Sequence, residues 1–200
     1  MKINSVFAIA ALLFLSGCAS SKMRVQDNQD LIAPDSDMAQ IVFMRSTFTG
    51  SAISASLFDV TDGEPEFIGI LSNATKLAHS VTPGKRIFMV VSEAADFMEA
   101  DLVAGKTYYS MVTPRMGAWV ARFSMHPVRN GGEGDFQYSS ERFQKWLKKT
   151  NFVENTAESQ TWFEATRSDI KMKQQKYWEV WQKKTPAALA ERTLNTGDGI

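Results

Sequence analysis

Residues 83–112 read PGKRIFMVVSEAADFMEADLVAGKTYYSMV, and this stretch decides the fold class. It holds three runs of strand length that are separated by turn-forming residues. Pro83-Gly84 fits the central positions of a type II turn, because proline presets φ and glycine accepts a positive φ. Ala104-Gly105 marks a second turn, after which the chain returns through Lys106–Val112. The stretch therefore predicts successive strands of an antiparallel β domain.

The same pattern continues on both sides, over residues 38–128. Short apolar runs between turn residues predict further strands at Gln40–Arg45, Ser54–Val60, Phe67–Leu71, Thr75–Val81 and Ala118–Met125. Short strands at this spacing are typical of a sandwich or an open barrel. We therefore predict an α+β fold: an antiparallel β-sandwich-like domain of about seven to eight strands over residues 38–129, followed by a helical segment that packs on it.

Residues 130–200 are predicted to be a helical C-terminal extension. After the glycine-rich junction at residues 130–134, Ser140 is placed to cap a helix over Glu141–Lys149. The apolar face of this helix carries Phe143, Trp146 and Leu147, which are spaced at i, i+3 and i+4.

A long second helix is predicted from Asn155 or Thr156 to about Lys184. Asn155 with Glu158, or Thr161 with Glu164, has the spacing of a capping pair. Pro186 suits the first position of a final short helix, and residues 195–200 form a polar tail.

The long helix carries an aromatic stripe. At about 100° per residue, one arc holds Trp162, Phe163, Ile170, Tyr177, Val180 and Trp181. An arc of this width is typical of a face that packs on the core of the same chain. Aromatic residues are also enriched in interface cores. The alternative is therefore an interface with a partner protein or a membrane surface, made by Trp162, Phe163, Ile170, Tyr177 and Trp181.

The N-terminus has the features of a signal peptide. Lys2 supplies a positive charge, and Val6–Leu15 is an unbroken run of ten apolar residues. As a helix this run would be about 15 Å long, which is half the hydrocarbon core of a bilayer. It is therefore too short for a transmembrane helix and suits the apolar region of a secretory signal.

The tetrapeptide Leu15-Ser16-Gly17-Cys18 resembles the lipobox of bacterial lipoproteins, and Cys18 is the only cysteine of the chain. The resemblance implies that residues 1–17 are removed and that Cys18 receives a diacylglycerol and an acylated amine. Two or more acyl chains hold a protein stably on a membrane. Ala19, where an aspartate would resemble an inner-membrane retention signal, implies the periplasmic face of the outer membrane of a Gram-negative cell. The alternative is a buried apolar N-terminal helix with an incidental cysteine.

Residues 18–37 are predicted to be the lipidated cysteine and a flexible or extended tether. Most of these residues are polar, and the apolar interruption before Pro34 is short. Such a segment cannot bury much surface, so we expect it to act as a spacer between lipid and domain.

The β domain is similar to an uncharacterised family of bacterial lipoproteins with a small β domain and often a lipobox. The resemblance rests on Pro83-Gly84, the apolar strand after it, Glu93 and the segment 104–109. The opening at Ile41–Arg45 and the strand at Phe67–Gly69 also fit. The similarity covers residues 39–127. It implies the fold and the cellular location, but it implies no catalytic residue.

Two adjacent tyrosines lie in that family-like segment. Because successive side chains of a strand point to opposite faces, Tyr108 and Tyr109 must lie on opposite sides of the sheet. We predict that one is in the core and that the other is at the surface or under the C-terminal helices.

Composition and motifs exclude several classes of function. The chain has 22 basic and 22 acidic residues, which argues against a dedicated nucleic-acid binder. Its single cysteine excludes a disulfide framework and a cysteine-based zinc site. His79 and His126 match no metal spacing, and Glu133 with Asp135 is more typical of a linker than of a calcium loop. Carboxylates at Glu93, Glu99 and Asp101 are the remaining candidates for a pair in space.

The sequence therefore predicts an outer-membrane-anchored periplasmic lipoprotein with a non-enzymatic binding, adaptor or structural role. It predicts no catalytic residue, cofactor or metal, and the membrane and an envelope protein as partners. The alternatives are an envelope enzyme whose site forms only in three dimensions, and an assembly subunit that uses the aromatic stripe. The oligomeric state is left open.

Overall fold

The computed structural model describes residues 22–47, 52–115 and 122–200 of the chain. The predicted signal peptide and Cys18 lie outside the described residues. In the described part the fold is mixed α+β, with eleven strands in two sheets. The strands are β1 (Met23–Val25), β2 (Ala39–Arg45), β3 (Ala55–Asp59), β4 (Glu66–Leu71), β5 (Thr75–Val81), β6 (Gly84–Val91), β7 (Ala95–Leu102), β8 (Thr107–Arg115), β9 (Arg122–Pro127), β10 (Asn151–Asn155) and β11 (Thr193–Leu194). The helices are α1 (Glu141–Lys149), α2 (Ala157–Trp181), α3 (Pro186–Ala190) and the 3-10 turn η1 (Thr196–Asp198).

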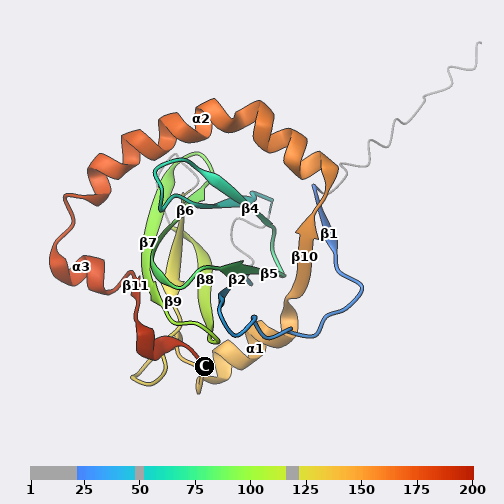
Figure 1. The fold of residues 1–200 in the computed structure, drawn as a ribbon, viewed down its shortest axis with the longest axis vertical. Coiled ribbons are helices and arrows are strands. Elements are labelled where there is room, and N and C mark those ends of the chain that lie inside the picture. Colours follow the sequence, from blue (N-terminus) through green and yellow to red (C-terminus); the bar gives the residue numbers. More distant parts are fainter. Residues whose placement is uncertain (1–21, 48–51, 116–121) are drawn as a thin grey trace, which may run out of the picture.

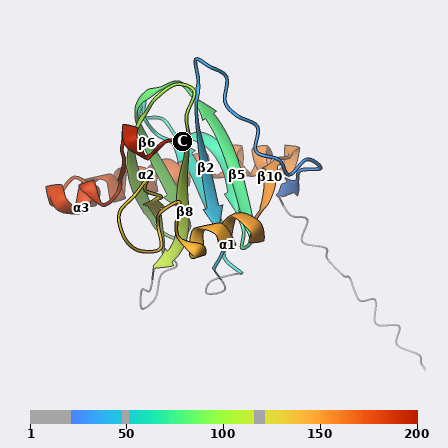
Figure 2. The ribbon, with the colours of Figure 1, turned by 90° about the horizontal axis from the view of Figure 1, so that it is seen from below.

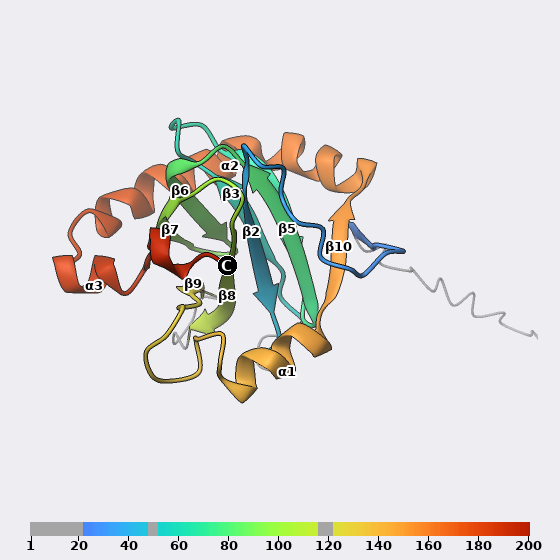
Figure 3. The same ribbon diagram turned by 60° about the horizontal axis from the view of Figure 1, so that its bottom comes forward.

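The strands form a six-stranded sheet, in the order β1-β10-β5-β2-β8-β9, and a five-stranded sheet, in the order β11-β7-β6-β3-β4. The eight predicted strands correspond to β2 to β9. Within residues 38–129 the prediction of an antiparallel domain was wrong at one pair, because β2 and β8 are parallel. The pairs of β5 with β10 and of β7 with β11, whose second strands lie outside that range, are also parallel. These partners lie far apart in the sequence, so the route of the chain sets their direction, and no local pattern reveals it (Figure 3).

The two sheets pack against each other, and the helices cover their outer faces. Phe43 of β2 meets Phe88 of β6 edge-on across the sheets, with ring centroids 5.3 Å apart. α1 and α2 lie on opposite sides of the molecule (Figure 1). All seven residues of β2 are buried, because one face meets the other sheet and the opposite face meets α1.

The tyrosine pair lies as predicted. Tyr108 is fully buried in the cluster between the sheets, and Tyr109 lies in the outer cluster under α1. Tyr109 contacts Phe143 of α1 edge-on, at 5.3 Å between ring centroids. α1 also begins at the predicted Ser140 cap, whose side chain accepts from the Phe143 N–H. Figure 2 shows α1 across the strands that it covers.

The long helix packs on the five-stranded sheet. Phe163, Ile170 and Trp181 are buried in one cluster with Phe58 and Phe97 of the sheet. Its N-terminus is capped by Thr156, which forms a capping box with Ser159. The helix starts where predicted, although the capping pair is neither of the two that the sequence suggested.

Three short strands were missed. β1 lies in the segment that we expected to be a flexible tether, and β10 and β11 lie in the segment that we expected to be helical. Each has five residues or fewer, so local periodicity is weak, and each is held by a partner far away in the sequence.

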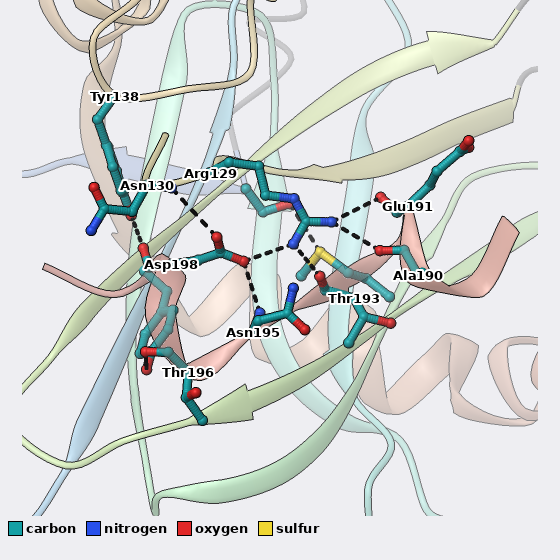
Figure 4. A network of polar contacts seen from close by, with 12 residues as sticks. Arg129, Asn130, Tyr138, Ala190, Glu191, Thr193, Asn195, Thr196 and Asp198 are labelled. Atoms are coloured by element: carbon teal, nitrogen blue, oxygen red, sulfur yellow. Dashed lines mark hydrogen bonds and ion pairs between the residues drawn. The ribbon is translucent and has the colours of Figure 1, made fainter. Parts of the chain in front are cut away.

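The C-terminal tail is docked rather than free (Figure 4). The Arg129 guanidinium lies 2.7 Å from the Asp198 carboxylate and donates to the backbone carbonyl of Ala190 at 2.9 Å. Tyr138 donates its hydroxyl to the Asp198 carbonyl at 2.6 Å. Ile200 exchanges backbone hydrogen bonds with Thr107. The polar groups of the tail thus belong to an internal hydrogen-bond network that attaches the tail to the start of β8.

We predict that Asp198→Ala lowers the free energy of unfolding by about 2 kcal/mol, because a partly buried guanidinium loses its charged partner. Asp135→Ala is the matched control, since it breaks an exposed ion pair with Arg142 and should cost less than about 0.5 kcal/mol. Urea unfolding followed by tryptophan fluorescence measures both. Equal losses in the two variants would show that the tail is not held by Asp198.

Candidate functional site

A cleft of about 580 Å³ opens between α2 and one end of the five-stranded sheet. Its volume lies within the range of small-molecule sites. The described residues that line it are Lys22, Met23, Ile53, Ser54, Ser56, Ile70, Ser72, Val91, Ser92, Glu93, Trp162, Thr166, Asp169, Ile170 and Lys173.

Five separate segments build the cleft. β3 begins at this end of the sheet, and β4 and β6 end there, because β3 is antiparallel to both of its neighbours. Residues 162–173 of α2 form the opposite wall, and the start of β1 closes one end. The serines that flank these strand ends are thereby brought together, although the sequence spreads them over nearly forty residues, from Ser54 to Ser92.

The lining combines apolar surface with hydroxyl groups. Val91 and Ile170 are buried members of the cluster under α2, and half-buried Trp162 continues that wall. The Trp162 ring lies 5.9 Å from the ring of Phe67, which supports it from behind. Four serines add hydroxyl groups, which can both donate and accept hydrogen bonds, and the Thr166 hydroxyl, which donates to the Trp162 carbonyl at 2.8 Å, adds an acceptor.

The charges of the lining balance. Lys22 and Lys173 supply two ammonium groups, and Glu93 and Asp169 supply two carboxylates. The Lys173 ammonium donates to the Ser92 carbonyl at 2.9 Å and lies 2.9 Å from the Asp169 carboxylate. Lys173 therefore ties α2 to the end of β6. A balanced lining favours a neutral or zwitterionic ligand over a free anion or cation.

The two histidines lie away from the cleft. His79 in β5 packs edge-on against Phe88, with ring centroids 6.4 Å apart, and burial lowers its pKa. His126 in β9 stacks on Phe136 at 4.6 Å and shares a 2.9 Å hydrogen bond with the Thr113 hydroxyl. Burial first, and the nearby Arg192 charge second, lower the pKa of His126 to about 4. Both rings are thus packing elements of the six-stranded sheet.

Of the three candidate carboxylates, Glu99 and Asp101 share one face of β7 because they are two residues apart, and Glu93 lies outside that strand. Glu93 lines the cleft, whereas Glu99 lies further along β7 and accepts a hydrogen bond from the Trp181 indole at 3.3 Å. Asp135 pairs with Arg142 at the start of α1. Within residues 22–47, 52–115 and 122–200, no group of three or more histidine, cysteine, aspartate or glutamate side chains has metal-binding geometry.

The aromatic stripe mainly contacts its own sheet. Of the five residues proposed for an interface, Phe163, Ile170 and Trp181 are at most 3% exposed. Tyr177 is half-buried beside them, and Trp162 is shared with the cleft. The stripe was selected for its period, and the period alone did not reveal that two of its residues, Trp162 and Ile170, line a cleft.

Across the described part of the chain, none of the helices combines the length and the apolarity needed to cross a bilayer. No protein-family model and no curated protein sequence matches this chain.

The low pKa of His126 predicts a loss of stability in mild acid. The unfolded chain, with a histidine pKa near 6.5, binds the proton before the folded chain does. Stability should therefore fall as the pH drops from 6.5 to about 4, by about 2 kcal/mol from this group after allowance for its partial exposure. Urea midpoints across this range should fall less steeply in His126→Gln. Parallel curves for the two proteins would contradict the assignment.

Proposed function

We propose that this chain is a lipid-anchored periplasmic protein of the Gram-negative outer membrane with a non-enzymatic binding role. The observation that carries the proposal is the position of its only cysteine, Cys18, at the end of the lipobox-like sequence Leu15-Ser16-Gly17-Cys18. A short apolar run with a basic residue before it precedes the tetrapeptide, as lipoprotein export requires.

The body of the protein is, in this proposal, a β-sandwich-like domain of the uncharacterised lipoprotein family that its sequence resembles. The two packed sheets support that interpretation, and so do the turns at Gly84 and Gly105. Both glycines have a positive φ, of 112° and 74°, which few other residues adopt without strain.

The cleft between α2 and the sheet is the proposed binding site. Its hydroxyl groups offer hydrogen bonds in both directions, and Trp162 with Ile170 offers apolar contact. Together with a balanced set of charges, these groups suit a small ligand that is partly apolar and carries no net charge. Recognition of this kind needs only that the hydroxyl, apolar and charged groups are held in place. The ends of β3, β4 and β6, together with α2, hold them.

The anchor has a direct test in cells that express the full chain. Wild-type protein should incorporate labelled palmitate and fractionate with the outer membrane, because two or more acyl chains hold it there. Cys18→Ser should incorporate none and should remain unprocessed. Ser21→Ala is the matched control and should behave as wild type. Continued acyl labelling of Cys18→Ser would remove the proposed anchor.

A further inference from the structure

The segment next to the proposed anchor is part of the folded body. β1 begins at Met23, and its register with β10 pairs Met23 with Asn155, Arg24 with Glu154 and Val25 with Val153. The hydroxyl of Thr156, at the N-terminus of α2, donates to the Lys22 carbonyl at 2.8 Å. The chain is therefore attached to the folded body at residues 22–25.

Side chains strengthen this attachment. The Gln29 amide extends the ladder by accepting from the Phe152 N–H at 2.6 Å and donating to the Phe152 carbonyl at 3.2 Å. Met23 is only 7% exposed and packs over Gly69. A Cβ atom at Gly69 would overlap Leu77 Cδ1 and lie 3.1 Å from the Met23 methyl, so the glycine leaves room for both side chains.

The pairing of β1 with β10 limits how far the folded body can lie from the proposed lipid anchor. A free tether from Cys18 to Asp37 could span about 65 Å at ~3.5 Å per residue. With β1 in place, only the four steps from Cys18 to Lys22 remain, and these span at most about 14 Å. This bound follows from covalent geometry and holds for any conformation of the link.

Lys22 and Met23 themselves line the cleft. We propose that the face around the cleft docks on the membrane that holds the anchor, and that its partner is the zwitterionic headgroups of the phospholipids. This proposal rests on the proposed acylation of Cys18. The cleft then opens at the membrane surface rather than into the open periplasm.

The chemistry of the face fits this partner. The charges of the lining balance, and Lys173 and Asp169 already pair with each other, so the face has no net charge that would favour anionic over zwitterionic lipid. Ile53, which is 40% exposed, and Trp162 add side chains that suit the boundary between headgroups and hydrocarbon. The short link supplies a high effective concentration, so that weak contacts suffice for docking.

Fluorescence quenching in vesicles tests the orientation. The full, processed chain is labelled through Ser72→Cys, on the exposed rim of the cleft, or through Lys85→Cys, at the opposite end of the sheet. Lys85 lies about 23 Å along β6 from the cleft end, at ~3.3 Å per residue. In phosphatidylethanolamine and phosphatidylcholine vesicles with a headgroup-attached quencher, the Ser72 label should be quenched several-fold more strongly than the Lys85 label.

A lengthened link provides the matched control. About fifteen Gly and Ser residues inserted between Ser20 and Ser21 leave β1 intact but let the body move away by tens of ångströms. The difference between the two labels should then disappear.

The outcomes separate the two proposals. Equal quenching of both labels in the unlengthened protein, with mass spectrometry showing an acylated Cys18, overturns the docked orientation and leaves the anchor in place. Absence of acyl groups on Cys18 overturns the anchor and the docking together. Strong quenching of the Ser72 label that persists after the insertion supports docking by the face itself and contradicts the role of the short link.

Discussion

Each sheet of this protein is apolar on both faces, and that constraint determines the rest of the fold. β2 shows it most clearly, since Ile41 and Phe43 meet the other sheet while Val42 and Met44 face the opposite side. A sheet exposed on its outer face would leave such side chains in water, at a cost of about 25 cal/mol for each Å². α1 and α2 are thus required as the outer layers, one on each sheet.

Local signals of the sequence were sufficient for the elements that carry their own pattern. The turn at Gly84 and the Ser140 cap each depend on one or two residues, so the sequence alone predicts them. Signals of the same local kind predicted the eight strands β2 to β9 and the helices α1 and α2. Strand order and direction were not predictable, because β2 lies between β5 and β8 through pairings over tens of residues. β1 has only three residues, and only Met23 among its side chains is buried, so no periodicity marks it.

The sequence did not predict the cleft, for a related reason. Its lining comes from five segments, and the residue types in it are common ones. Serines at strand ends usually signal turns, and Lys173 is one of several lysines along α2. The structure gives that lysine a role, since its ammonium joins Asp169 on the helix to the Ser92 carbonyl at the end of β6.

β1 also covers one edge of the six-stranded sheet. Without it, β10 would present an open edge, and unpaired edges of this kind favour association with other chains. Burial of Met23 contributes about 2 kcal/mol, and each ladder hydrogen bond adds about 1 kcal/mol. The same contacts that close the sheet thus resist detachment of the link. In the proposed lipid-anchored protein, the distance between bilayer and cleft would therefore depend on the folded state, and loss of β1 would release the cleft from the membrane surface without removing the proposed anchor.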